Sequence, residues 1–251
     1  MSNILICGTR GTGKSTEALA VAEEWGGTIV IRDSRGSYGK IGVQCHSIEE
    51  LQEHLESGDY IIDGVPQPLV VHIDTMDQEK SFEELCGFLF PPNFEGFEGK
   101  LVLLIDESAN LQGPNYINPA LDRLVGQHPL DDILVIQTTH EIKEWNSKCK
   151  SCIDEMHLFY QVGETNYTRI EELCGKDVED TVRSFAPESK TDPKIHYFVR
   201  YSFREFFEGG KRYEICTDPS LWYRELGQQN RLPGNREKEE LADGHKEYQQ
   251  A

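Results

Sequence analysis

Residues 8 to 16 read GTRGTGKST and match G-x-x-x-x-G-K-[ST], a pattern typical of a loop that binds phosphate groups. In such a loop the backbone N–H groups surround phosphate oxygens, the lysine reaches the β- and γ-phosphates, and the final hydroxyl binds Mg²⁺. An apolar run precedes this loop and a helical pattern follows it, so a chance match of a glycine-rich turn is the weaker interpretation. Lys14 is therefore a predicted catalytic residue and Ser15 a predicted metal ligand. The predicted nucleotide-binding residues are Gly8, Thr9, Arg10, Gly11, Thr12, Gly13, Lys14, Ser15 and Thr16.

Two carboxylates follow the apolar run LVLLI at Asp106 and Glu107. A buried strand over 101–105 would deliver both to its carboxyl end, beside the phosphate loop in a parallel sheet. Asp106 would then hold Mg²⁺ through water, and Glu107 would polarise the water that attacks the γ-phosphate. Taken alone, acidic residues often start the loop after a strand, so this assignment depends on the loop being present.

Two further candidates come from the segments that follow. Residues 132–137 predict another buried strand, which ends in the polar sequence QTTH from Gln137 to His140, and such a group can sense a γ-phosphate. The alternative is a strand end that simply meets solvent. Arg123, on a predicted helix, could stabilise the transferring phosphoryl group, including that of a neighbouring subunit, although a helix arginine is often only solvated or surface-paired.

The elements that must position these residues alternate between strand and helix. The predicted strands lie over 4–7, 28–32, 68–74, 101–105, 132–137, 156–162 and 195–203, and the predicted helices over 14–25, 48–57, 82–90, 119–125 and 168–174. Strands that are apolar on both faces predict an α/β fold with a mostly parallel central sheet flanked by helices on both faces. We expect a single domain over 1–226 and a polar C-terminal tail over 227–251 that buries too little to order itself.

Composition limits the possible partners and compartments. The formal net charge is -19, from 25 Lys and Arg against 44 Asp and Glu, so a surface that attracts nucleic acid everywhere is excluded. The basic residues cluster locally: Lys143, Lys148 and Lys150 in one stretch, and Lys194, Arg200, Arg204, Lys211 and Arg212 in another. Apolar runs of about five residues fall far short of the roughly 20 that span a bilayer, and no signal segment is seen, so we expect a soluble, cytoplasmic protein without a membrane partner.

The seven cysteines are an odd number spread along the chain, which favours reduced thiols. Cys149 and Cys152, with His140 and His157 nearby, have half of a zinc-site spacing. Because a second such pair is missing, reduced cysteines near a turn are the favoured interpretation.

In order and spacing these motifs resemble the FtsK–HerA superfamily of P-loop ATPases, and within it the small genome-packaging ATPases of viruses and phages. The resemblance covers residues 4–175. It rests on the loop, on Asp33 to Tyr38 (similar to the family's D-P-x-G-E-Y, with Ser37 in place of the glutamate), on LVLLIDESAN, on CIDEMHLFYQVGETNYTRIEELCG (similar to the family's closing strand and helix), and on LDRLVGQHPLDDILVIQTTH. The last of these aligns Gln137 with the family's sensor glutamine, although the arginine and proline that follow it in the family are missing here.

The resemblance implies a RecA-like P-loop NTPase core that hydrolyses ATP with Mg²⁺ and translocates DNA, here into a viral capsid. It further implies a ring, usually of six subunits, around double-stranded DNA, a capsid vertex protein as a possible partner, and the host cytoplasm as the location. Three alternatives stay open: a nucleoside or nucleotide kinase, an assembly ATPase of the filamentous-phage type, and a nucleotide-binding regulator without turnover.

Overall fold

A computed structural model describes residues 2–73, 77–90, 99–127, 132–146, 152–189, 192–204, 206–207 and 210–217. The strands of the main sheet are β1 (Ser2–Cys7), β2 (Thr28–Arg32), β3 (Val43–Cys45), β6 (Leu69–Val71), β7 (Leu101–Ile105), β10 (Ile133–Thr139), β11 (Glu155–Phe159), β12 (Tyr197–Ser202) and β13 (Tyr213–Thr217). The helices are α1 (Lys14–Trp25), α2 (Ile48–Ser57), α3 (Gln78–Leu89), α4 (Pro119–Gln127), α5 (Glu164–Cys174) and α6 (Lys176–Ser184). Two small hairpins pair β4 (Ile61–Ile62) with β5 (Val65–Pro66), and β8 (Gln112–Gly113) with β9 (Tyr116–Ile117).

The nine-stranded sheet has the order β13-β12-β11-β1-β10-β7-β2-β6-β3. All pairs from β11 to β3 are parallel, and β12 and β13 extend the sheet with antiparallel pairs. The central strands β7 and β10 are buried along their whole length, as parallel strands covered on both faces must be. The predicted α/β architecture with a mostly parallel central sheet is therefore confirmed.

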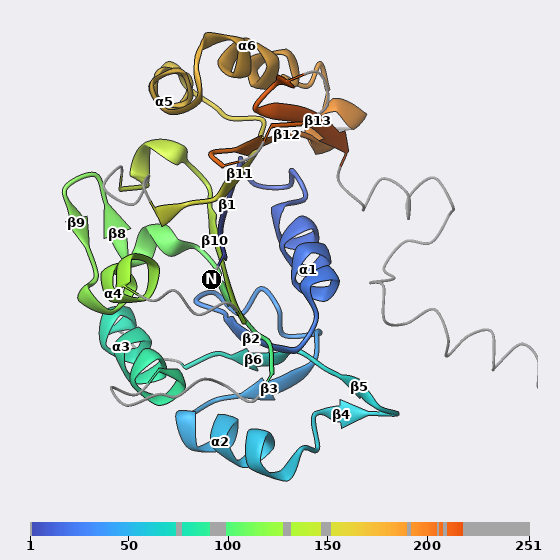
Figure 1. The fold of residues 1–251 in the computed structure, drawn as a ribbon, viewed down its shortest axis with the longest axis vertical. Helices are drawn as coiled ribbons and strands as arrows, with labels where there is room; N and C mark the ends of the chain where they lie inside the picture. Colours follow the sequence, from blue (N-terminus) through green and yellow to red (C-terminus); the bar gives the residue numbers. More distant parts are fainter. Residues whose placement is uncertain are drawn as a thin grey trace, which may run out of the picture.

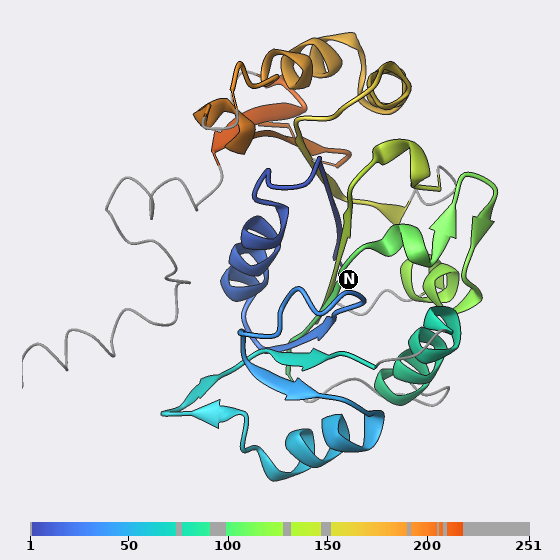
Figure 2. The ribbon, with the colours of Figure 1, turned by 180° about the vertical axis from the view of Figure 1, so that it is seen from behind.

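Helices cover both faces of the sheet, but unequally (Figures 1 and 2). Alternate residues of β1 face opposite sides, so Ile6 packs with Ala18 and Leu19 of α1 in one core cluster, and Leu5 belongs to the other. That second cluster also takes in the buried sides of α2 through α6. Among the described helices, α1 covers the face of the sheet on which Ile6 lies, and this helix begins at the phosphate loop.

Short sequence patterns predicted the bounds of several helices and strands correctly. Helix α1 and strands β2 and β7 have the predicted bounds, and Ser47 caps α2 by accepting a hydrogen bond from the backbone N–H of Glu50. Helix α3 differs from the prediction, because Asp77 rather than Ser81 is its cap and the helix begins at Gln78.

The end of the sheet also differs from the prediction. The strand predicted over 195–203 is not the last one, because β13 follows it and pairs with it, and helix α6 is a further element that the sequence pattern does not predict. Among the described residues, no helix combines the length and apolar character needed to cross a bilayer. The predicted tail over 227–251 lies outside the described residues.

Candidate functional site

The glycine loop leaves the carboxyl end of β1 and is fixed to the two strands beside it. The backbone N–H of Gly8 donates to the Thr139 carbonyl at 3.2 Å, and that of Thr9 donates to the Tyr160 carbonyl at 3.0 Å. Gly8 is required by close approach, since a Cβ there would lie 2.5 Å from the Phe159 Cβ. Gly13 precedes α1 with a φ of 103°, a left-handed conformation that glycine adopts without strain. The sequence pattern therefore encodes the shape of the loop as well as its chemistry.

A cavity of about 610 Å³ opens between this loop and the carboxyl ends of β2, β7 and β10. Its walls include the predicted residues Arg10, Gly11, Gly13, Lys14, Ser15, Thr16, Asp106 and Glu107. The structure thus brings the phosphate loop and both carboxylates to one place. The predicted residues Gly8, Thr9, Thr12, Gln137 and Arg123 are not among its lining residues.

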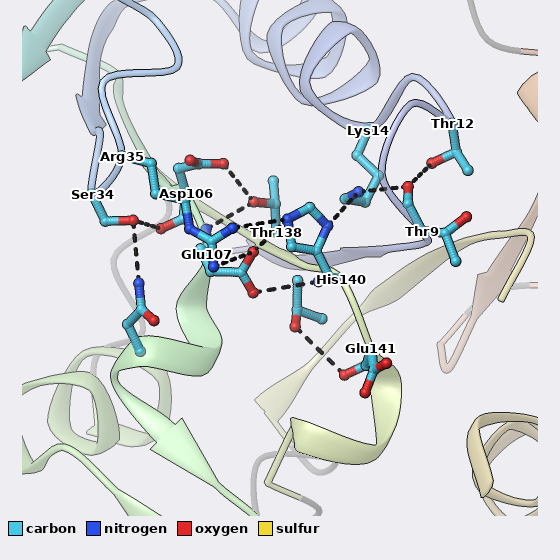
Figure 3. A network of polar contacts seen from close by, with 12 residues as sticks. Thr9, Thr12, Lys14, Ser34, Arg35, Asp106, Glu107, Thr138, His140 and Glu141 are labelled. Atoms are coloured by element: carbon cyan, nitrogen blue, oxygen red, sulfur yellow. Dashed lines mark hydrogen bonds and ion pairs between the residues drawn. The ribbon is translucent and has the colours of Figure 1, made fainter. Parts of the chain in front are cut away.

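Lys14 is 7% exposed and its ammonium group points into this cavity (Figure 3). Nζ donates to the Thr9 carbonyl at 3.0 Å and lies 3.2 Å from His140 Nδ1. Burial lowers the pKa of Lys14, while the nearby negative charges of Glu107 and Asp106 oppose that shift. A buried ammonium that retains free donor capacity is suited to bind an anion.

Thr138 connects the two carboxylate residues. Its hydroxyl donates to Asp106 Oδ1 at 3.0 Å and accepts the backbone N–H of Glu107 at 3.1 Å. Burial raises the pKa of Asp106, and the charges of Asp33 and Glu107 add to that shift. Thr138 and Lys14 act in the opposite direction, so the hydroxyl both orients the Asp106 carboxylate and stabilises its charged form.

Glu107 is only 5% exposed and has an unusual, left-handed backbone conformation, with φ 51° and ψ 63°. A non-glycine residue in this region carries a strain of about 1–3 kcal/mol, which is seen mainly at functional sites. The carboxylate Oε2 lies 2.9 Å from His140 Nε2 and 3.6 Å from Arg35 Nη2. The strained turn thus directs Glu107 into the cavity, where two nitrogen-bearing side chains meet it (Figure 3).

Arg35 reaches the cavity because Asp33 folds the loop after β2. The Asp33 carboxylate accepts backbone N–H groups of Arg35, Ser37 and Tyr38 at 3.2, 2.9 and 2.7 Å. Tyr38 anchors the loop, being 1% exposed and packed in the α1-side core. The Asp33 to Tyr38 motif, on which the resemblance partly rests, therefore holds the loop backbone in the conformation that places Arg35 at the cavity.

The residues present fit a divalent cation at Ser15 and Asp106. Asp106 is a buried carboxylate whose pKa is raised in part by other negative charges, a situation that a bound cation relieves. Both residues line the cavity, and Mg²⁺ in phosphate sites is held by one or two protein oxygens together with water and phosphate oxygens. Clusters of three or more His, Cys, Asp or Glu able to hold a metal ion do not occur in the described part of the chain, and this kind of site does not require one.

Gln137 and Arg123 lie elsewhere. Gln137 is fully buried, and its Oε1 accepts a hydrogen bond from Gln112 Nε2 at 2.9 Å. Arg123 is exposed on α4, so a role for it in the site of a neighbouring subunit stays a prediction.

Sequence reasoning passed over Thr138, His140 and Arg35 as site residues. The register pairs Gln137 with Ile105, which puts Thr138 next to Asp106 on the same face of the sheet. Because side chains alternate along β10, Thr138 and His140 lie on the same side of the sheet. If the register were known, both could therefore be predicted as site residues. The sequence alone contains the strand but not its register.

The remaining candidates have structural partners. His157 lies between Glu17 at 2.9 Å and Glu155 at 3.4 Å, and Glu155 also binds Arg200 through two hydrogen bonds. Cys152 is a partly buried cysteine, whereas Cys149 lies outside the described residues. In the basic clusters, Lys143, Lys194, Arg200 and Arg204 each pair with a carboxylate, and Lys148 and Lys150 are outside the described residues.

The sheet order, the loop and the cavity together define the architecture of a P-loop NTPase. Among solved structures, the chain is similar to the genome packaging NTPase B204 from Sulfolobus turreted icosahedral virus 2. The B204 complex with ATP-gammaS gives a TM-score of 0.62 at 16% identity, covering 86% of this chain and 96% of that one. The AMPPCP complex gives 0.61 at 18%, covering 86% and 97%.

A further structure, of B204 as the DNA-packaging ATPase from Sulfolobus Turreted Icosahedral Virus, gives a TM-score of 0.61 at 18% identity, covering 86% of this chain and 97% of that one. Neither a protein-family model nor a curated protein sequence matches the chain. The structural matches confirm the resemblance at the level of the fold.

Proposed function

We propose that this chain is a Mg²⁺-dependent ATPase that uses ATP hydrolysis to move DNA into a viral capsid. The observation that carries the proposal is the placement of a phosphate-binding lysine and a carboxylate in one cavity. Lys14 Nζ and Glu107 Oε2 lie 3.2 and 2.9 Å from the two nitrogens of a single imidazole, that of His140. The similarity to a genome-packaging NTPase supports the packaging part of the proposal.

In the reaction, Lys14 and the loop N–H groups hold the phosphates. Ser15 and Asp106 would hold Mg²⁺, which would supply charge neutralisation for the phosphate groups. A water oxygen attacks the γ-phosphorus, the bond from that phosphorus to the bridging oxygen breaks, and ADP leaves with the electron pair. Glu107 accepts the proton released by the attacking water, so the products are ADP and inorganic phosphate.

The acidic composition suits this proposal. A net charge of -19 disfavours DNA binding over most of the surface, so DNA would be held only where a ring of subunits confines it. Such a ring, with a capsid vertex protein as its docking partner, belongs to the proposal. Because Lys194, Arg200 and Arg204 each pair with a carboxylate, we assign the DNA contact to none of these three residues.

The test measures phosphate release from ATP with Mg²⁺ or EDTA and with or without duplex DNA, alongside the mass of the particle. We expect DNA-stimulated, Mg²⁺-dependent hydrolysis by an assembly larger than a monomer. Glu107→Gln should bind ATP but hydrolyse it about 10²- to 10⁴-fold more slowly, and Lys14→Ala should bind it weakly. Glu53→Gln, an exposed position on α2, is the matched control and should behave as wild type.

Two outcomes would contradict the proposal. If the protein is a monomer whose ATP hydrolysis does not respond to DNA, DNA translocation is excluded as its function. Transfer of the γ-phosphate to an added nucleoside, retained in Glu107→Gln, would favour the kinase alternative, because a kinase does not need a residue that activates water.

A further inference from the structure

His140 links the phosphate-binding lysine to the carboxylate at the site. It follows directly after β10 and is 126 residues from Lys14 in the chain, yet its Nδ1 lies 3.2 Å from Lys14 Nζ. Its Nε2 lies 2.9 Å from Glu107 Oε2, and its backbone N–H donates to Glu107 Oε1 at 3.4 Å. Figure 3 shows the imidazole between the two side chains.

The chemistry of the partners favours one tautomer. A lysine ammonium has donors only, so Nδ1 accepts from Lys14 at 3.2 Å. The ring proton is then on Nε2, where the Glu107 carboxylate accepts it at 2.9 Å, and the donor-only Arg35 Nη1 at 3.3 Å from the same nitrogen is the longer contact. Burial and the Lys14 charge lower the pKa of His140, against the opposing effect of Glu107, which agrees with a neutral ring.

Arg35 also reaches Glu107 but holds it less firmly. Its Nη2 lies 3.6 Å from Oε2, and the Arg35 side chain is 52% exposed, whereas that of His140 is 34% exposed. Exposed ion pairs contribute little because water screens them. The shorter contact and the bond from its backbone N–H make His140 the main residue that orients Glu107.

We propose that His140 is a positioning residue that couples Lys14 to Glu107, so that the position of the lysine on a γ-phosphate sets the position of the carboxylate that accepts the water proton. This inference rests on the proposed ATPase function. It gives His140 the reporting role that the sequence had suggested for Gln137, whose side chain hydrogen-bonds Gln112 instead.

The first test separates turnover from binding. His140→Ala should lower kcat about 10-fold or more, a part of the ~10²- to 10⁴-fold that a positioned proton acceptor contributes. The Kd for ATP should change by less than about threefold, since the Thr9 carbonyl contact of Lys14 remains. His46→Ala, at an exposed residue that does not line the cavity, is the control and should match wild type in both quantities.

Two conservative variants test the link itself. An asparagine amide lies near the place of Nδ1 and can accept from Lys14, whereas a glutamine amide lies near the place of Nε2 and can donate to Glu107. His140→Asn and His140→Gln each keep one contact, so both should stay well below wild-type kcat. Full rescue by either would show that one contact suffices and would overturn the coupling.

A double-mutant cycle with Glu107→Gln completes the experiment. If His140 acts through Glu107, adding His140→Ala to Glu107→Gln should lower kcat no further. A full additional loss would mean that His140 acts independently, and the inference would be wrong. Thermal unfolding of each variant without nucleotide verifies that all are folded.

The two proposals fail in different ways. Absence of ATP hydrolysis in the wild-type protein would remove the proposed function itself. Hydrolysis by wild type with an unchanged kcat in His140→Ala would leave that function standing and remove the positioning role alone.

Discussion

Thr138→Val removes a single hydroxyl and keeps the shape of the side chain, at a position only 2% exposed. In the native protein that hydroxyl donates to Asp106 Oδ1 at 3.0 Å and accepts the Glu107 N–H at 3.1 Å. A hydrogen bond to a charged group contributes about 1.5–3 kcal/mol, and a buried N–H left without an acceptor costs about 1–3 kcal/mol. Because both effects depend on one hydroxyl, we expect a combined loss of about 2–4 kcal/mol in the free energy of unfolding.

Urea denaturation at neutral pH, without nucleotide or metal, measures this loss directly. Thr138→Ser keeps the hydroxyl and should retain most of the stability. Thr181→Val at the surface of α6, where the hydroxyl donates to the Asp177 carbonyl at 2.7 Å, should change it by less than about 0.5 kcal/mol. Thr138→Val should also weaken the apparent affinity for Mg²⁺ by about 10- to 100-fold, the usual effect of losing a partner that orients a metal ligand.

A Thr138→Val protein that unfolds at the wild-type urea concentration with an unchanged slope would show that the hydroxyl does not stabilise the fold. Equal losses of stability in Thr138→Val and Thr138→Ser would show that the loss comes from packing rather than from the hydroxyl.

Three further predictions follow from the site and its surroundings. Gly8→Ala places a Cβ 2.5 Å from the Phe159 Cβ, so it should lower both stability and ATP affinity, whereas Gly113→Ala, with open space around it, should do neither; equal calorimetric midpoints for the two would contradict the close approach. Burial lowers the pKa of His157, but its two carboxylate partners outweigh burial and raise the pKa above the ordinary value of 6.5. The contribution of His157 to folding stability is therefore fully present below pH 6.5 and is lost as pH rises through the pKa of the folded state. His157→Gln should therefore shift the urea midpoint more at about pH 5.5 than at about pH 9, and an equal shift at both would count against this. Arg123→Ala should slow hydrolysis only in the assembled protein, and a wild-type rate in assembled Arg123→Ala would remove Arg123 from the site.

Some of the site could be predicted because short-range chemistry specifies it. The glycine loop needs particular residue types within nine positions, and the helix that follows begins at Lys14 as its pattern requires. The five apolar residues of β7 place Asp106 and Glu107 at a strand end whatever the rest of the fold does. These features depend on backbone conformations and periods that a few neighbouring residues determine.

The rest depended on contacts between distant segments. Which side of β10 faces the cavity follows from pairing Gln137 with Ile105, and a shift of one residue would have turned Gln137 inward and Thr138 outward. The meeting of Lys14 with His140, and of Arg35 with Glu107, likewise requires the strand order in which β10 and β2 both flank β7. Short segments of the sequence specify the phosphate loop and the pair of carboxylates. The side chains that join them at the site are specified by the folded sheet, because sheet order and register are set by the packing of the whole core and not by any one segment.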